Sequence, residues 1–234
     1  MRNKKVVGIV GGMGPEATVD LFKKIIKATP ALKDQDHLRI LIDNNTSVPD
    51  RTNAINGDGP SPVEEIKKSL KFLESGGAEI FAMPCNTAHY YYNELKNEVD
   101  GEFIHMMNEV AYNIKDHFPS VKKVGILATT GTLNTKLYHK ALERMKLEVI
   151  EPKDNDQLEV MEAIYAPWGI KAGKYKDAKT VLKRVCQKLI TDGADLIIMG
   201  CTEIPLALDQ TDAQVELLDA TQVLANAIVA KAFK

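Results

Sequence analysis

Short apolar runs alternate with longer amphipathic segments along most of the chain. The apolar runs lie at 6–10, 38–42, 78–84, 124–127 and 196–199. Short runs that are mostly apolar are typical of strands buried in a parallel sheet. Because segments with helical periodicity separate them, the pattern predicts an α/β fold with parallel sheets.

Three segments show the pattern expected of helices. Apolar residues recur at helical spacing over 63–73, and Ser61-Pro62-Val63-Glu64 predicts a capping box with proline at the first helical position. Segment 178–191 has the same periodicity and ends before a glycine. A last helix is predicted over 221–233, packed back onto the first half of the chain.

The chain also contains a duplication with a long period. Residues 7–10 return 117 positions later as residues 124–127. Residues 77–85 return 116 positions later as residues 193–201, so that Cys85 and Cys201 are images of each other. We therefore predict two pseudo-symmetric domains, each with a central, mostly parallel sheet flanked by helices. The first covers 1–115 plus 216–234 and the second 116–215, with a connection at 113–120.

Composition narrows the class of protein. The 234 residues are 44% hydrophobic and 26% charged, and 30 basic against 32 acidic residues give a formal net charge of −2. Charges of both signs are interspersed, which argues against a nucleic-acid partner. The apolar runs are too short for a signal peptide or a membrane span, so a soluble, cytoplasmic protein with no membrane partner is expected. The three cysteines lack zinc-site spacing, which predicts free thiols.

The duplicated cysteines carry the candidate chemistry. Each follows a predicted strand and precedes cap-type residues, and ligands bind outside the carboxyl ends of strands in open α/β sheets. If the two halves face each other, both thiols border one interdomain cleft, which is the predicted active site. Inverting a stereocentre requires proton removal on one face and proton delivery on the other, and two like acid/base groups serve both directions. Helix N-termini with the hydroxyls of Thr87 and Thr202 can hold a carboxylate, so neither a cofactor nor a metal is expected.

Cysteine is also among the most buried residue types, and a single cysteine is more often part of a core than of an active site. Recurrence in register argues against that interpretation for Cys85 and Cys201. Cys186 has no image in the first half and lies within a helical period, so it is predicted to be a core residue. Cys85 with His89 is a poor metal pair, because no histidine accompanies Cys201.

Three motifs recur in one known family. They are Gly11-Gly12-Met13-Gly14-Pro15-Glu16-Ala17-Thr18, Met83-Pro84-Cys85-Asn86-Thr87-Ala88-His89 and Gly200-Cys201-Thr202-Glu203. Together they resemble the aspartate/glutamate racemase superfamily, specifically its aspartate racemase branch, over essentially the whole chain. The resemblance implies an isomerase that racemises an amino acid without pyridoxal phosphate, with Cys85 and Cys201 as its two bases. It also implies two pseudo-symmetric domains with the site between them, and a homodimer.

The resemblance further assigns substrate contacts. It makes Arg51 and Lys171 ligands for the side-chain carboxylate of a small acidic amino acid, and arginine can bind a carboxylate through two parallel hydrogen bonds. It places Asn86, Thr87, Thr130 and Thr202 around the substrate's own carboxylate and ammonium. Met13, Asn45 and Glu203 complete the set. The alternative for Arg51 and Lys171 is that both are surface charges.

Departures from related sequences define the remaining alternatives. Glutamate racemases typically carry Asp-Ser-Gly in the first loop and His after the second Cys-Thr, whereas this chain has Gly12-Met13-Gly14 and Glu203, which favours aspartate. A glutamate or broad-specificity racemase, a hydantoin racemase and a maleate isomerase stay open. A loose dinucleotide pattern, Gly12-x-Gly14-x-x-Ala17 with Asp43, leaves an NAD enzyme as a remote alternative. A protein that binds an acidic amino acid without turning it over is another. Segment 154–174 is expected to form a mobile cover that carries Lys171.

Overall fold

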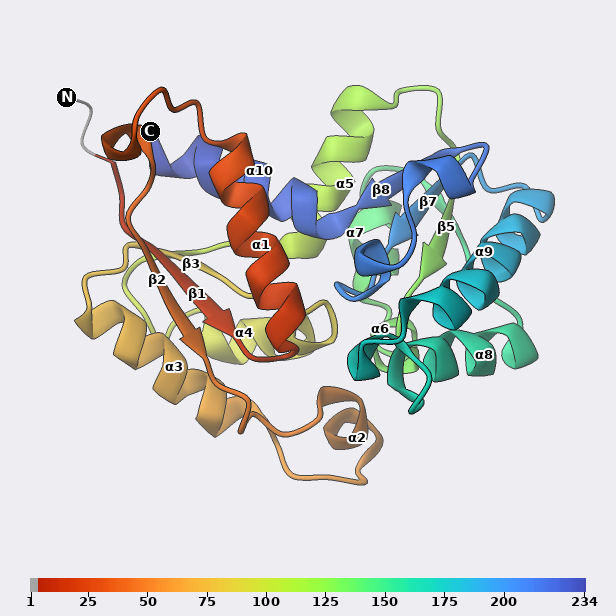
Figure 1. The fold of residues 1–234 in the computed structure, drawn as a ribbon, viewed down its shortest axis with the longest axis horizontal. Coiled ribbons are helices and arrows are strands. Elements are labelled where there is room, and N and C mark those ends of the chain that lie inside the picture. Colours follow the sequence, from red (N-terminus) through yellow and green to blue (C-terminus); the bar gives the residue numbers. More distant parts are fainter. Residues whose placement is uncertain (1–3) are drawn as a thin grey trace. The chain divides into compact units, whose positions relative to one another are not determined.

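The computed structural model describes residues 4–234, which form two compact α/β units (Figure 1). Unit 1 contains the chain up to Glu109 together with Thr221–Lys234, and unit 2 contains Val110–Ala220. Each unit has its own four-stranded parallel sheet, which confirms the predicted fold class. Within the described residues, no helix has the length and apolar character needed to span a membrane.

The sheet of unit 1 has the strand order β2-β1-β3-β4. Its strands are β1 (Val7–Gly11), β2 (Ile40–Asn44), β3 (Ile80–Ala82) and β4 (Glu102–Phe103). The α-helices that begin in this unit are α1 (Pro15–Ala28), α2 (Arg51–Asn56), α3 (Val63–Ser75), α4 (Tyr92–Leu95) and α5 (Met106–His117), and the 3-10 helices span Asp34–Asp36 and Thr87–Tyr91. The final helix, α10 (Ala220–Ala232), returns to this unit, where the N–H of Lys5 donates to the carbonyl oxygen of Ala232 at 3.1 Å.

The sheet of unit 2 repeats that order as β6-β5-β7-β8. Its strands are β5 (Lys123–Leu127), β6 (Glu148–Ile150), β7 (Leu196–Met199) and β8 (Glu216–Asp219). Its α-helices are α6 (Thr130–Asn134), α7 (Leu137–Glu143), α8 (Asp154–Tyr165) and α9 (Tyr175–Thr191), and its 3-10 helices span Ile170–Ala172, Ile204–Leu206 and Gln210–Asp212. The two sheets therefore share one topology, as the duplication predicts.

In both sheets the second strand lies on one side of the first strand, and the third and fourth strands lie on its other side. Right-handed crossovers then place successive helices on opposite faces of the sheet. Figure 1 shows α1 and α3 on the two sides of the β1–β2 pair. Open α/β sheets bind ligands at the carboxyl ends of the strands where the order reverses. Cys85 follows β3 and Cys201 follows β7, which are the strands that pair with β1 and β5.

A duplicated glycine lets a loop pack closely against the first strand of each sheet. A Cβ atom on Gly8 would lie 2.9 Å from the Cβ of Ala78. A Cβ atom on Gly125 would lie 3.2 Å from the Cβ of Ala194, which is the image of Ala78. Neither position has room for a larger residue, because protein interiors are close-packed. The recurrence of Gly8 as Gly125 is therefore a packing requirement in both units.

Cys186 lies in the apolar core of unit 2, where it is 1% exposed and packs with side chains of α8 and α9. Burial, with a smaller contribution from the charge of Asp212, raises the pKa of this thiol to about 11. A thiol of this kind stays protonated and unreactive at neutral pH. The prediction that Cys186 is a core residue is confirmed.

Several local predictions differ from the structure. Helix α3 begins at Val63, and the hydroxyl of Ser61 accepts from the N–H of Val63 at 3.3 Å, so the predicted capping box does not form. Segment 113–120 is not a free connection, because α5 continues to His117. The predicted cover at 154–174 is largely the helix α8, which contributes Val160, Ala163 and Ile164 to the core. The part after Tyr165 contains the 3-10 helix Ile170–Ala172, whose Ile170 is also buried in this core.

Candidate active site

Cys85 is 5% exposed and lies in a turn whose backbone is held by His89. The Nδ1 atom of His89 is 2.8 Å from the carbonyl oxygen of Cys85, and its Nε2 atom accepts from the N–H of Met106 at 3.2 Å. Because Nε2 accepts, Nδ1 carries the proton and donates it. Burial and, to a smaller extent, the charge of His105 lower the pKa of His89 to about 3. His89 is therefore a neutral structural residue.

This arrangement also explains why a 3-10 helix follows Cys85. In an α-helix the carbonyl oxygen of Cys85 would accept from the N–H of His89. Here the ring of His89 takes that carbonyl, and the N–H of His89 donates instead to the carbonyl oxygen of Asn86 at 3.0 Å. Asn86 and Thr87, both expected near the substrate, begin this turn and are 3% and 5% exposed.

Both ring nitrogens of His89 are engaged, which removes it as a metal ligand. Among the described residues, no group of three or more His, Cys, Asp or Glu side chains is arranged to hold a metal ion.

Arg51 is a buried residue and not a surface charge. It is 7% exposed, and its guanidinium donates to the carbonyl oxygens of Met13 and Pro49, each at 3.1 Å. Asn45 lies beside the same loop, because a Cβ atom on Gly12 would be 2.3 Å from the carbonyl oxygen of Asn45. The structure thus brings three expected substrate-binding residues, Met13, Asn45 and Arg51, to one loop region at the carboxyl end of β1.

Cys201 belongs to a chain of polar contacts in unit 2. Its thiol donates to Oε2 of Glu203, with Sγ and Oε2 3.0 Å apart, and the hydroxyl of Thr202 donates to the same oxygen at 3.3 Å. The other carboxylate oxygen of Glu203, Oε1, accepts from Nζ of Lys171 at 2.7 Å. The Nζ atom of Lys171 also lies 5.4 Å from the ring centroid of Tyr165. Four expected site residues are therefore joined in one network.

The electrostatics of this network determine which group holds the proton. Burial raises the pKa of the Cys201 thiol well above its usual range, and the negative charge of Glu203 raises it further. For Glu203 burial acts in the same direction, but the charge of Lys171 and the hydrogen bonds from Cys201 and Lys171 outweigh it, so that its pKa lies below its usual range. At neutral pH the thiol is therefore protonated and the carboxylate is ionised.

Thr130 lies apart from this network in the contacts that the structure records. Its hydroxyl accepts from Nε2 of Gln157 at 3.2 Å, and the same Nε2 donates to the carbonyl oxygen of Ala128 at 3.0 Å. Gln157 therefore holds the loop that follows β5. The sequence does not predict this role of Gln157, because a glutamine on a helix carries no signal of the loop that it will contact.

Tyr138 was also missed. It is buried on α7, and a Cβ atom on Gly200 would be 3.1 Å from its ring. Burial and, to a smaller extent, the charge of Asp219 raise its pKa far above the usual range for tyrosine, so Tyr138 is a neutral phenol in the surroundings of Cys201. A single tyrosine in the sequence carries no signal of the cysteine that it will approach.

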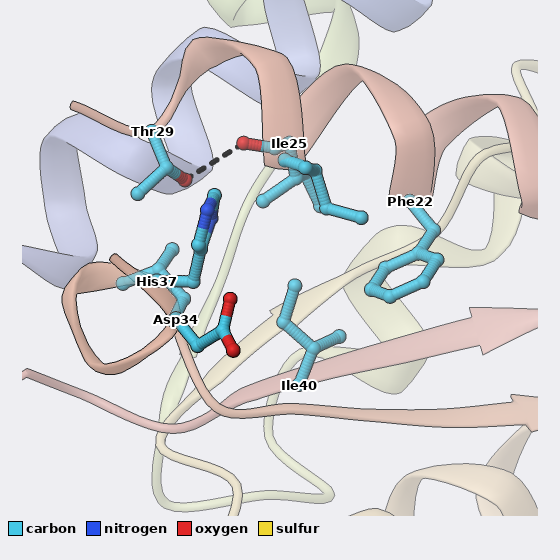
Figure 2. Close-up of a pocket in the computed structure, with 8 residues that line it drawn as sticks. Phe22, Ile25, Thr29, Asp34, His37 and Ile40 are labelled. Carbon is cyan, nitrogen blue, oxygen red and sulfur yellow. Dashed lines mark hydrogen bonds between the residues drawn. The ribbon is translucent and has the colours of Figure 1, made fainter. Parts of the chain in front are cut away.

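A hollow of about 350 Å³ lies elsewhere, between α1 and β2 (Figure 2). Its lining residues are Phe22, Ile25, Ile26, Thr29, Asp34, His37, Leu38 and Ile40. In Figure 2 the side chains of Phe22, Ile25 and Ile40 lie around it. None of the expected catalytic or substrate-binding residues belongs to this lining, so it is separate from the candidate site.

The chain is similar to a known protein family over most of its length. The family model described as Asp/Glu/Hydantoin racemase matches residues 10–228. The chain is 31% identical over 232 residues to the broad specificity amino-acid racemase RacX of Bacillus subtilis (strain 168), covering 96% of each chain.

Solved structures show the same similarity. The chain matches an aspartate racemase from Picrophilus torridus with a TM-score of 0.82 and 31% identity, covering 97% of this chain and 94% of that one. It matches an aspartate racemase homologue from Pyrococcus horikoshii OT3 with a TM-score of 0.78 and 27% identity, covering 98% and 100%. The similarity therefore extends over both units.

Proposed function

The chain belongs to the Asp/Glu/hydantoin racemase family, and from this membership we propose that it interconverts the L and D enantiomers of aspartate. In the proposed reaction Cys85 and Cys201 are the two acid/base groups. One thiolate removes the α-proton from one face of the substrate, and the other thiol delivers a proton to the opposite face. The reverse reaction exchanges their roles. Both transfers use the protein's own thiols and the proposal assigns no cofactor.

The observation that supports an acidic substrate most directly is the contact between Lys171 and Glu203. A carboxylate oxygen is 2.7 Å from Nζ of Lys171, and the same carboxyl group contacts the thiol of Cys201. Recognition of an acidic side chain requires a cation that can bind a carboxylate close to a candidate base, and Lys171 has this position. This supports the proposal that Lys171 binds the side-chain carboxylate of aspartate.

Arg51 would supply the second positive charge. Its contacts with the backbone of Met13 and Pro49 hold the guanidinium in one orientation, and a positioned arginine loses little freedom when it binds a carboxylate. We further assign the contacts with the substrate's own carboxylate and ammonium to Asn45, Asn86, Thr87, Thr130 and Thr202.

A second candidate is a racemase that accepts many amino acids. The similarity to RacX, whose name gives broad specificity, favours it. The two candidates differ in what happens without a side-chain carboxylate. An aspartate racemase turns alanine over poorly, whereas a broad-specificity racemase accepts alanine and aspartate at similar rates.

The test is incubation of the purified protein with L-aspartate in deuterated buffer, without added cofactor. Chiral chromatography follows D-aspartate, and NMR follows replacement of the α-proton by deuterium. We expect both signals in the wild type, their loss in Cys85→Ser and in Cys201→Ser, and unchanged rates in the matched control Cys186→Ser. A panel with glutamate, alanine and serine sets the specificity. Absence of exchange with every amino acid in folded protein would contradict the proposal.

We also propose that the protein is a homodimer whose contact includes the outer face of α1. Val19, Phe22 and Ile26 lie on that face and are 65%, 37% and 41% exposed. Glu16 lies in the first turn of this helix and Lys27 in its last turn. If two copies of α1 pack antiparallel about a twofold axis, Glu16 of each copy approaches Lys27 of the other, so the face is complementary to itself.

Sedimentation velocity tests this contact. We expect a dimer for the wild type and a monomer for Phe22→Glu, because a charge in a small apolar interface is costly. Phe72→Glu is the matched control, since Phe72 is an exposed phenylalanine on α3, away from this face. A monomeric wild type, or equal dissociation in both variants, would refute the assignment.

A further inference from the structure

Lys171 is already paired with a carboxylate of the protein itself. The carboxylate of Glu203 bridges Lys171 and Cys201, with Nζ at 2.7 Å from one oxygen and Sγ at 3.0 Å from the other. A substrate carboxylate that binds Lys171 must therefore compete with Glu203. The two carboxylates compete for Nζ of Lys171, and the carboxyl group of Glu203 also accepts the hydrogen bond of the Cys201 thiol.

We propose that an acidic substrate activates Cys201 by taking Lys171 away from Glu203, whereupon Glu203 accepts the proton of Cys201 and leaves the thiolate. The inference rests on the proposed function, because it assumes that Cys201 acts as a base. In the reverse direction the proton returns from Oε2 of Glu203 to Sγ of Cys201 as the sulfur delivers a proton to the substrate. It gives Glu203 a role that differs from binding the substrate. Glu203 is then a proton acceptor, and Lys171 determines when it accepts.

The proton transfer is balanced within the pair. The S–H bond of Cys201 breaks, and an O–H bond forms on Oε2 of Glu203, along the hydrogen bond that already joins the two atoms. The pair carries one negative charge before and after the transfer. The buried site therefore never has to hold a second charge on these two groups, which would carry a large desolvation cost.

Lys171 has the position that such a switch needs. Its charge is the largest favourable influence on the ionised form of Glu203, and burial opposes that form. When Lys171 pairs with a substrate carboxylate, Glu203 loses its counter-charge in a buried environment and becomes a stronger base. The hydroxyl of Thr202 then remains as a second hydrogen-bonding partner of the carboxyl group.

Accessibility favours the same order of events. The side chain of Lys171 is 25% exposed, whereas that of Glu203 is 5% exposed. An arriving carboxylate therefore meets Lys171 before it meets Glu203. A substrate without a side-chain carboxylate leaves the Lys171–Glu203 pair intact, so Cys201 keeps its proton. Selection for acidic substrates would then operate through the formation of the base as well as through binding.

The first test is the kinetics of Glu203→Gln with aspartate. Glutamine is isosteric with glutamate but cannot accept the proton, so kcat is expected to fall roughly 10²–10³-fold. KM is expected to fall as well, by roughly fivefold, because Lys171 loses a competing partner. A residue that only bound the substrate would give a higher KM. Glu203→Asp, which keeps the carboxylate, should recover part of kcat.

The second test observes the proton without turnover. Succinate resembles aspartate without the amino group, and butyrate is the matched ligand in which a methyl group replaces one carboxylate. Infrared difference spectra of the Cys85→Ser/Cys186→Ser protein report the S–H stretch of Cys201 alone. We expect saturating succinate to remove this band and to add a protonated carboxyl band, and butyrate to do neither. In Glu203→Gln the S–H band should persist with both ligands.

Each outcome is decisive. An S–H band that survives saturating succinate, or a raised KM in Glu203→Gln, overturns the inference while leaving aspartate racemisation intact. Failure of succinate to bind also overturns it, because Lys171 would then not take a carboxylate. The proposed function itself fails only if the wild type exchanges no α-proton.

Discussion

Removal of the Lys171 charge tests the central ion pair through stability, independently of activity. In Lys171→Met the carboxylate of Glu203, with a side chain 5% exposed, loses the cation 2.7 Å away. Breaking a fully buried pair costs roughly 3–5 kcal/mol. Because a quarter of the Lys171 side chain is exposed to water, we expect the free energy of unfolding to fall by about 2–3 kcal/mol. For a chain of this length that corresponds to a decrease in Tm of roughly 4–12 °C.

The pH dependence identifies the cause. In the wild type the pKa of Glu203 lies below its usual range, so the pair stabilises the fold above the unfolded pKa of about 4.3, and this contribution is lost as pH falls through the folded pKa. Without Lys171 burial dominates and raises the pKa of Glu203, and the folded variant takes up a proton as pH decreases. The stability difference between variant and wild type should therefore be largest at pH 7–8 and shrink toward pH 4.

Urea unfolding monitored by circular dichroism from pH 4 to pH 8 provides the measurement. Lys176→Met is the matched control, because Lys176 is an exposed lysine of the same region, and a change below about 0.5 kcal/mol is expected. The double variant Lys171→Met/Glu203→Gln removes both charges and should recover most of the loss. A loss that is independent of pH, or that the double variant fails to recover, would refute the electrostatic reasoning.

Two further predictions concern unit 1. Gly12→Ala should lower both activity and stability, because Gly12 has φ +88° and a Cβ there would lie 2.3 Å from the backbone of Asn45. The control is Gly57→Ala, where φ is +84° and no described atom lies within 4 Å of the added Cβ, so the free energy of unfolding should fall by only about 1 kcal/mol. Equal effects of the two variants in thermal melts would contradict this prediction. The pKa of His89 is about 3 in the folded protein and about 6.5 in the unfolded chain, so between these pH values only the unfolded chain takes up a proton. The free energy of unfolding of the wild type should therefore fall by up to about 1.4 kcal/mol per pH unit as pH falls from 6.5 toward 3. His89→Asn should flatten this slope in urea titrations, and an unchanged slope would show that another group causes it.

The sequence predicts the central strands β1, β3, β5 and β7, because buried parallel strands are short, apolar and bounded by turns. It also predicts β2, but it gives no signal of the edge strands β4, β6 and β8. The prediction of a strand at 196–199 is confirmed by β7, Leu196–Met199. The duplication also predicts the common topology of the two sheets. The duplication also extends to a pair of hydrogen bonds at the start of each sheet. Glu79 accepts from the N–H of Val6 at 3.0 Å, and its image Asp195 accepts from the N–H of Lys123 at 2.9 Å.

The site was less predictable, because its decisive contacts join side chains that are distant in sequence. Periodicity does not report that Lys171 and Glu203, 32 positions apart, form an ion pair. Local signals also compete with tertiary contacts. Asn86 and Thr87 are typical of a helix start, yet the ring of His89 takes the carbonyl that an α-helix would use. Motifs thus indicate which residues gather near Cys201, and only the structure shows that Lys171 contacts Glu203.

The return of α10 to unit 1 has a consequence for synthesis on the ribosome. Unit 2 is one continuous stretch, Val110–Ala220, whereas unit 1 needs Thr221–Lys234, which are translated after all of unit 2. The nascent chain therefore holds the complete sequence of unit 2 before it holds that of unit 1, the reverse of the usual order in which N-terminal domains fold first. Until α10 emerges, the surface of unit 1 that it covers, including its contact with Lys5, stays open to chaperones and to incorrect pairing.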